Sequence, residues 1–160
     1  SLVRYRDWFE AGGGEMDGIT LEHLPAYNTS VIAARALPPS TAVARVPLHM
    51  CIHAMTAYHC PRIGACLRAM KERGLIDDRT AVCLFLAQEQ ALGAQSVWEA
   101  YISVLPTTFT TPLQHTPEQF SLLRDTPLGK LTELTKHEIK TTFEAVIEAA
   151  VKEPKTFGAL

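Results

Sequence analysis

The strand-forming segments of this 160-residue chain lie ahead of Pro47, and nearly everything after that proline has the pattern of helix. Ile19 and Leu21 alternate with polar neighbours, as strand residues do. Two further extended segments, 31–34 and 43–46, flank a Pro-Pro-Ser turn, so the pattern predicts a hairpin there. A few short strands cannot bury both of their faces by themselves. The sequence therefore predicts an α+β fold in which helices complete a small sheet.

Glycine, proline and capping residues mark where the helices should begin and end. Helices are expected over residues 2–11, 63–73, from Asp77 or Asp78 to Gly93, from a capping box at Thr116 onward, and over 130–152. The uninterrupted apolar run 81–87 predicts a central helix that is buried on all sides. Cys66 and Cys83 fall within these patterns and are expected to be small core residues.

The bulk composition limits the classes of partner. The formal net charge is −2, so no nucleic acid is expected to bind. The chain contains no run of about 18 apolar residues, so no membrane span is expected. Four irregularly spaced cysteines do not indicate a disulfide framework, and the N-terminus lacks the order of a signal peptide. These features favour an intracellular setting, cytoplasmic or nuclear.

A series of short motifs resembles one enzyme family. Residues 96–106 read Ser-x-Trp-x-x-Tyr-Ile-x-x-Leu-Pro, and Thr-Pro-Leu follows at 111–113. This order resembles the insert region of SET-domain protein methyltransferases of the Rubisco large-subunit lysine methyltransferase and SETD-like branch. Further pieces match in the same order, at residues 28–37, 43–47, 84–89 and 118–128. The resemblance covers roughly residues 1–130. It implies a SET β-portion with a leading helix at 1–53 and a helical insert region at 54–160.

The resemblance also implies where a cofactor would bind. Asn28, Thr29, Ser30 and Val31 occupy the position of the family's loop for S-adenosylmethionine, where the family has a Gly-x-Gly pattern. Asparagine tolerates positive φ better than most residues, and serine is small, so the turn itself is compatible with this sequence. Each side chain nevertheless adds bulk where glycine has none.

The family's C-terminal motifs have no match in this sequence. No Asn-His pair occurs, and no tyrosine matches the family's catalytic one, so we assign no catalytic residue. The chain is therefore expected to stop before the C-terminal SET portion and to be inactive alone. The resemblance implies transfer of methyl groups from S-adenosylmethionine to a lysine, or a histidine, of a protein substrate. The alternative is a non-catalytic helical protein-interaction module derived from a SET domain. The sequence indicates no oligomeric state.

Three smaller patterns have both a functional and a structural interpretation. Cys51, His53, His59 and Cys60 are of the residue types that bind zinc, but their spacing differs from the usual ligand pairs, so no metal site is predicted. Glu89 interrupts an apolar helix and could reach a functional cleft, or it could face solvent or pair with an arginine. Trp98 and Tyr101 are three residues apart, so they should share a helix face and pack the insert against the strands. A contribution to a substrate groove is the functional alternative.

Overall fold

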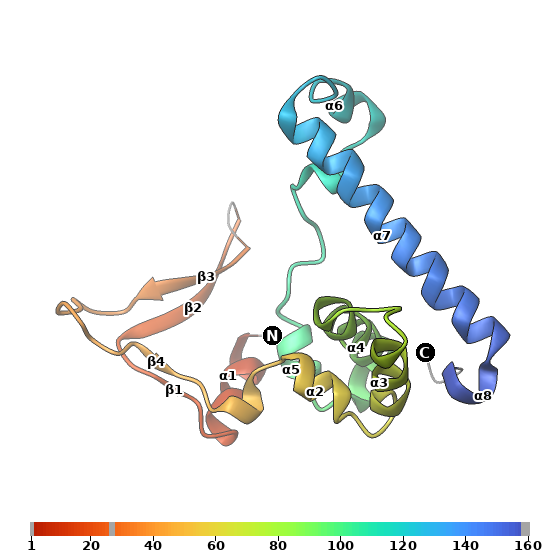
Figure 1. The fold of residues 1–160 in the computed structure, drawn as a ribbon. Coiled ribbons are helices and arrows are strands. Elements are labelled where there is room, and N and C mark those ends of the chain that lie inside the picture. The colour runs from red at the N-terminus through yellow and green to blue at the C-terminus, as the bar shows by residue number, and fades with distance from the viewer. Residues whose placement is uncertain (1, 26–27, 158–160) are drawn as a thin grey trace. The chain divides into compact units, whose positions relative to one another are not determined.

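After one leading helix, the strands of this chain precede the remaining helices, as predicted. The computed structural model describes residues 2–25 and 28–157 (Figure 1). The strands are β1 Glu15–Met16, β2 Ile19–Leu24, β3 Asn28–Ala33 and β4 Ala44–Arg45. The helices are α1 Leu2–Ala11, α2 Ala54–Tyr58, α3 Gly64–Glu72, α4 Asp78–Leu92, α5 Glu99–Ile102, α6 Pro117–Ser121, α7 Pro127–Lys152 and α8 Pro154–Phe157, with 3-10 turns η1 Leu48–Met50, η2 Gly93–Gln95 and η3 Pro112–Gln114. The α+β fold class is confirmed. None of the described helices is both long and apolar enough to cross a membrane.

Two compact units share the chain, and each is built from two segments of sequence. The first unit runs up to Ala57 and resumes at Val82–Pro106; the second combines Tyr58–Ala81 with the residues from Thr107 onward. The boundary predicted between residues 53 and 54 comes from the family resemblance and does not refer to compact units. It stays a prediction.

The strands form two separate antiparallel pairs. β2 pairs with β3 from Ile19 opposite Ala33 to Leu24 opposite Asn28, and β1 pairs with β4. The predicted hairpin between 31–34 and 43–46 is therefore wrong, although both segments are extended. β3 pairs instead with the strand that precedes it by three residues, because closing a short loop costs less entropy than closing a longer one.

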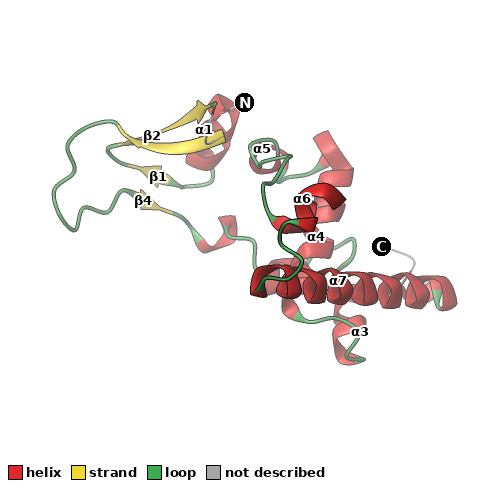
Figure 2. Ribbon diagram, turned by 90° about the horizontal axis from the view of Figure 1, so that it is seen from above, coloured by secondary structure: helices red, strands yellow, loops and turns green. Residues whose placement is uncertain are grey.

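In the first unit, α1 packs on the segment around α5 through aromatic side chains. Trp98 is buried, and its ring centroid lies 5.8 Å from that of Trp8 and 6.5 Å from those of Phe85 and Tyr101. The Trp8 indole N–H donates to the carbonyl oxygen of Val97 at 3.1 Å. Trp98 thus packs against a helix rather than the strands, which corrects the predicted partner. Figure 2 shows the strands beside α1.

Helix α4 differs from its prediction. Its cap is the predicted one, since the Asp77 carboxylate accepts the Thr80 amide N–H at 2.7 Å. However, only one stripe of the helix is buried, at Ala81, Phe85 and Glu89, whereas Cys83 is exposed. The predicted burial on all sides is wrong, because an apolar run is compatible with a buried helix but does not supply the neighbours that would cover every face.

In the second unit, α3 packs against α8. Ile63, Leu67, Met70 and Phe157 are the largest fully buried side chains of the described residues. The buried Cys66 thiol donates to the Phe157 carbonyl oxygen, which confirms Cys66 as a core residue, and burial raises the pKa of this thiol. The predicted capping box at Thr116 is also present, with reciprocal hydrogen bonds between Thr116 and Gln119.

A tyrosine–aspartate contact in this unit predicts alkaline sensitivity. The Tyr58 hydroxyl donates to Asp78 Oδ1 at 2.7 Å, and burial, followed by this hydrogen bond, raises the pKa of Tyr58 from 10.0 to about 12. A raised folded-state pKa contributes stability that is fully present below pH 10 and is lost as the pH rises through about 12. We expect Tyr58→Phe to melt at a lower temperature than wild type at pH 9, with the difference shrinking toward pH 12. Circular dichroism melts across this range check it; a constant difference would contradict the assignment.

Candidate functional site

The predicted cofactor residues form the start of β3. Asn28 has a φ of +55°, in the left-handed region that asparagine tolerates better than most residues. Asparagine is therefore compatible with the positive φ at this position. Asn28 and Thr29 are exposed, Ser30 is half-buried, and the apolar side chain of Val31 is 62 % exposed. The site is an accessible strand end rather than a closed cavity.

The pairing of β3 with β2 divides these four residues between two faces. Side chains alternate along a strand, and directly paired residues share a face. Val31 is paired with Leu21 and Thr29 with His23, so Thr29 and Val31 share the face of Leu21. Asn28 and Ser30 lie on the opposite face. The structure thus places the four residues on one strand without bringing all four side chains together.

One contact ties this strand to the helical part of the first unit. The Thr29 hydroxyl donates a long hydrogen bond of 3.4 Å to the Val104 carbonyl oxygen, just after α5. Because α5 in turn packs on α1, this hydrogen bond links the start of β3 to the aromatic cluster around Trp98. A hydroxyl–carbonyl contact of this kind contributes about 1 kcal/mol, so it orients the strand rather than holding it rigidly.

The other end of the hairpin depends on a glycine. Gly18 has a φ of +68°, and its carbonyl oxygen accepts the Ala34 amide N–H at 2.9 Å. A Cβ at this position would lie 2.6 Å from Leu37 Cδ2, so a side chain would clash as well as strain the backbone. Arg35 and Asp17 form an exposed ion pair of 2.8 Å at the same end. The Gly18–Ala34 hydrogen bond continues the register that places Asn28 opposite Leu24.

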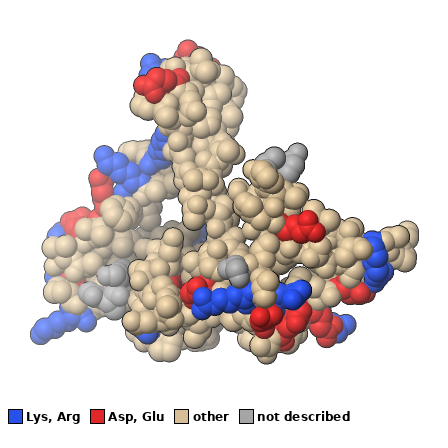
Figure 3. All heavy atoms as spheres, turned by 180° about the vertical axis from the view of Figure 1, so that it is seen from behind, with Lys and Arg blue, Asp and Glu red and all other residues tan. Residues whose placement is uncertain are grey.

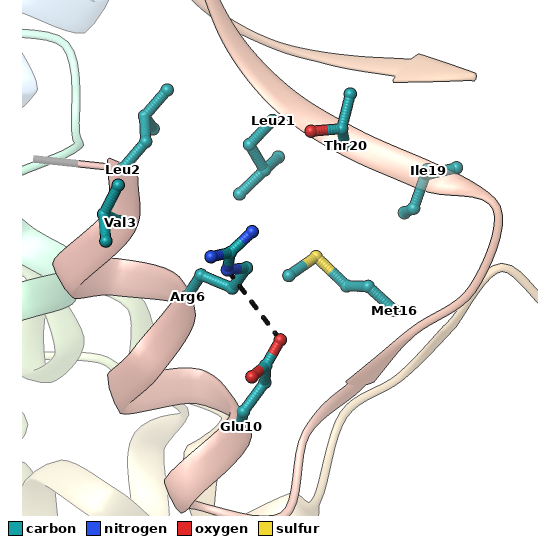
Figure 4. A pocket seen from close by; sticks show the side chains of 8 residues that line it. All are labelled: Leu2, Val3, Arg6, Glu10, Met16, Ile19, Thr20 and Leu21. Carbon is teal, nitrogen blue, oxygen red and sulfur yellow. Dashed lines mark ion pairs between the residues drawn. The ribbon is translucent and has the colours of Figure 1, made fainter. Parts of the chain in front are cut away.

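A pocket of about 240 Å³ lies between α1 and the strands, on the face that Leu21 shares with Val31. Figure 4 shows Leu21 and Met16 directed toward Arg6, which extends across the opening from α1. Arg6 Nε lies 3.9 Å from Glu10 Oε1, and both side chains are more than half exposed. Arg6 and Glu10 thus place opposite charges at the edge of a pocket with mixed polar and apolar walls.

Sequence reasoning did not find this pocket. It is lined by Leu2, Val3, Arg6, Glu10, Met16, Ile19, Thr20 and Leu21. The spacing of Arg6 and Glu10, four residues apart on a helix, was the available signal. The strand β1, with Met16, is two residues long and carries no periodicity that could have been detected.

Glu89 has a structural role in the first unit. Its carboxylate is 6 % exposed and accepts the Ser96 hydroxyl at 2.6 Å, while Ser96 Oγ accepts the Trp98 amide N–H at 2.9 Å. This chain of hydrogen bonds fixes the turn that leads into Trp98. Glu89 is therefore neither a solvent-facing carboxylate nor a group that opens onto a cleft.

The structure gives no support to a zinc site. Within residues 2–25 and 28–157, no group of three or more His, Cys, Asp or Glu side chains is placed to hold a metal ion, and Cys51, His53, His59 and Cys60 are among those residues.

On the face seen in Figure 3, basic and acidic side chains are interspersed rather than gathered by sign.

The hydrogen-bonded chain from Glu89 predicts a measurable loss of stability. Glu89→Ala leaves the Ser96 hydroxyl without its buried charged acceptor, which should lower the free energy of unfolding by about 1.5–3 kcal/mol. The neighbouring Gln90 is exposed, so Gln90→Ala should change it by less than about 0.5 kcal/mol. Urea unfolding followed by tryptophan fluorescence compares the two variants. Equal effects would mean that Glu89 does not hold the turn.

Parts of several known proteins are similar in sequence to this chain. No family model matches the chain. It is 28 % identical over 124 residues to the actin-histidine N-methyltransferase of Drosophila melanogaster, covering 78 % of this chain and 22 % of that protein. It is 33 % identical over 63 residues to SET domain-containing protein 4 of Mus musculus, covering 39 % of this chain and 14 % of that protein. The human protein of the same name is 35 % identical over 57 residues, covering 36 % of this chain and 13 % of its own length.

The fold has a solved counterpart. With a TM-score of 0.81 and 19 % sequence identity, 98 % of this chain matches 36 % of the chain of Rubisco LSMT, solved with sinefungin and monomethyllysine. The chain spans about a fifth or less of the length of the curated relatives named above. It is thus related to the SET-domain methyltransferases, which it matches over part of their length, and it has the fold of the corresponding part of Rubisco LSMT.

Proposed function

We propose that this chain forms the amino-terminal part of an S-adenosylmethionine-dependent protein N-methyltransferase, in which residues 28–31 line the cofactor. The observation that carries the proposal is the fold, which matches over 98 % of the chain that of an enzyme bound to sinefungin and monomethyllysine. Sinefungin is an analogue of S-adenosylmethionine. The left-handed Asn28 at the start of an accessible strand supports the assignment of the loop.

The reaction moves a methyl group from the sulfonium sulfur of the cofactor to a nitrogen of the substrate. The new bond is N–C, the S–C bond breaks with its electron pair left on sulfur, and an attacking amine must already have lost a proton. At neutral pH, deprotonating a lysine of pKa about 10.4 costs about 4–5 kcal/mol. A histidine of pKa about 6.5 is already largely neutral, so it presents a nitrogen lone pair at almost no such cost.

Both substrate types have support among the relatives. The Drosophila relative is named for actin histidine, and the solved neighbour holds monomethyllysine. We propose a protein substrate with a lysine or histidine acceptor. We further propose an intracellular setting, which the four free cysteines support.

We also propose that residues 1–160 by themselves bind the cofactor weakly and do not turn over. The support is the chemistry of the described site, where Asn28 and Ser30 carry side chains at the two glycine positions of the family's pattern, and Asn28 and Thr29 are exposed to water. A strand of this kind can contact one side of a ligand but cannot enclose it. Tight small-molecule sites bury most of the ligand surface.

The alternative is a non-catalytic helical interaction module. The observation that favours it is the apolar surface of α7, where Ile139, Phe143, Ile147 and Val151 are exposed. A cofactor titration separates the two functions, because an interaction module has no reason to contact S-adenosylmethionine through β3.

The cofactor assignment predicts a localised response. We expect calorimetry with S-adenosylmethionine to give a dissociation constant weaker than about 1 μM, equivalent to less than about 8 kcal/mol of binding free energy. In an NMR titration at millimolar cofactor, the amide signals of residues 28–31 should shift. A dissociation constant of about 1 μM or tighter would contradict the weak binding. Shifts confined to the α1 pocket would contradict the site.

The left-handed residue provides matched variants. Asn28→Val places a β-branched residue at positive φ, which should displace the strand start and abolish the shifts, whereas Asn28→Gly should preserve them. Ser40 has a φ of +62° outside the proposed site, so Ser40→Val imposes a similar backbone penalty. If Ser40→Val also abolished the shifts, the effect of Asn28→Val would reflect general destabilisation and the site would lose its support.

A further inference from the structure

Three Thr-Pro pairs lie in the second unit, and each one starts a helical turn. Thr111, Thr116 and Thr126 precede η3, α6 and α7, and a proline follows each of them. Proline disfavours the α conformation in the residue before it, and all three threonines are extended, with ψ between 151° and 160°. The three pairs therefore share a sequence and a backbone conformation.

The hydroxyl groups of two of these threonines are already engaged. Thr126 is half-buried, and its hydroxyl donates to the Leu123 carbonyl oxygen at 2.7 Å and accepts the Gly129 amide N–H at 3.0 Å. The Thr116 hydroxyl accepts the Gln119 amide N–H at 3.3 Å, and the Gln119 side chain accepts the Thr116 amide N–H in return. These bonds cap α6 and α7, so freeing either hydroxyl requires the first turn of its helix to open.

Thr111 differs from the other two. It is exposed, and its side chain makes no hydrogen bond that caps η3. Residues 106–110 before it are exposed as well and belong to no helix or strand. The η3 that follows is a single 3-10 turn, a form with weaker hydrogen-bond geometry than an α-helix. The Thr111 hydroxyl is therefore accessible, on a stretch of backbone that can extend without opening an α-helix.

A threonine followed by proline is the acceptor that one class of protein kinase selects. Such a kinase binds the acceptor segment in an extended conformation, which proline favours in the residue before it. Proline also has no backbone N–H that the kinase would have to accommodate. We propose that Thr111 is a phosphorylation site for a proline-directed protein kinase, with ATP as the phosphoryl donor. Thr111 is remote in sequence from residues 28–31, so the proposal does not depend on the proposed cofactor site.

The transfer joins Thr111 to the terminal phosphoryl group of ATP. Thr111 Oγ1 forms a bond to the γ-phosphorus while the bond from that phosphorus to the bridging oxygen breaks, and its electron pair stays on ADP. The hydroxyl proton passes to the carboxylate base of the kinase. Residues 100–117 contain no Asp, Glu, Lys or Arg. The phosphate would therefore add a charge of about −1.5 to −2 to a segment whose one other ionisable group of neutral range is His115.

The first test compares the three threonines within the intact 160-residue chain. The protein is incubated with a proline-directed mitogen-activated protein kinase and magnesium ATP, and mass spectrometry of phosphopeptides gives the initial rate at each site. Synthetic peptides 107–115, 112–120 and 122–130 carry one Thr-Pro pair each and give the rates without folded structure. Dividing the rate in the protein by the rate in the peptide removes the preference of the kinase for neighbouring residues.

We expect this ratio to be at least about tenfold higher for Thr111 than for Thr116 or Thr126, because only the last two need a helix start to open before they react. A ratio for Thr111 that does not exceed the other two would overturn the proposal. A peptide 107–115 that the kinase leaves unmodified would overturn it as well.

Matched variants test the site and its recognition. Thr111→Ala should remove the main phosphate, whereas Thr110→Ala, in the same exposed loop but not followed by proline, should retain it. Pro112→Ala keeps the acceptor hydroxyl and should lower the rate at Thr111 at least about tenfold, while Pro117→Ala should leave that rate unchanged. Circular dichroism checks that each variant keeps its helices.

Two outcomes of the variant series would contradict the proposal. A main phosphate that persists in Thr111→Ala would place the site at another residue. A Pro112→Ala protein that is modified at Thr111 as fast as wild type would show that the proline is not recognised, so the assigned class of kinase would be wrong.

Discussion

The first unit depends on the packing of Trp98 against α1. This contact joins two segments that are about ninety residues apart in sequence. The second segment includes Val104, which accepts the hydrogen bond from Thr29 at the start of β3. The centroids of the Trp8 and Trp98 rings lie 5.8 Å apart with tilted planes. Such a pair stabilises the contact beyond what the burial of the rings contributes. Glu89 and Ser96 hold the turn that presents Trp98. The geometry of β3 is therefore determined partly by residues that have no direct contact with it.

Local signals were sufficient for most of the helices. The glycines after α1 and α3, the aspartate before α4 and the threonine before α6 act within one turn of where they stand, so short stretches of sequence predicted them. The left-handed conformation of Asn28 was likewise compatible with its residue type alone. In these cases, the physical cause and the sequence signal involve the same few residues.

The features that sequence reasoning missed depend on distant partners. Which strands pair is decided by loop lengths and by what covers each face, so the segment 43–46 was recognised as extended but assigned the wrong neighbour. The exposure of Cys83 and the packing partner of Trp98 were missed for the same reason. An apolar side chain indicates that burial is favourable, but the sequence does not state which surface provides it. The pocket beside α1 escaped detection because it is formed by ordinary residues from three elements.

Under the proposed function, the exposure of β3 also bears on the choice of acceptor nitrogen. A lysine amine loses its proton readily only where burial or nearby charge lowers its pKa, and a strand whose Asn28 and Thr29 face water leaves a neighbouring ammonium hydrated. Imidazole needs no such environment, because most of it is neutral at pH 7 and only the correct nitrogen has to be presented. Alignment is then the remaining demand. Within that proposal, the described strand end suits the alignment of an acceptor better than the removal of its proton.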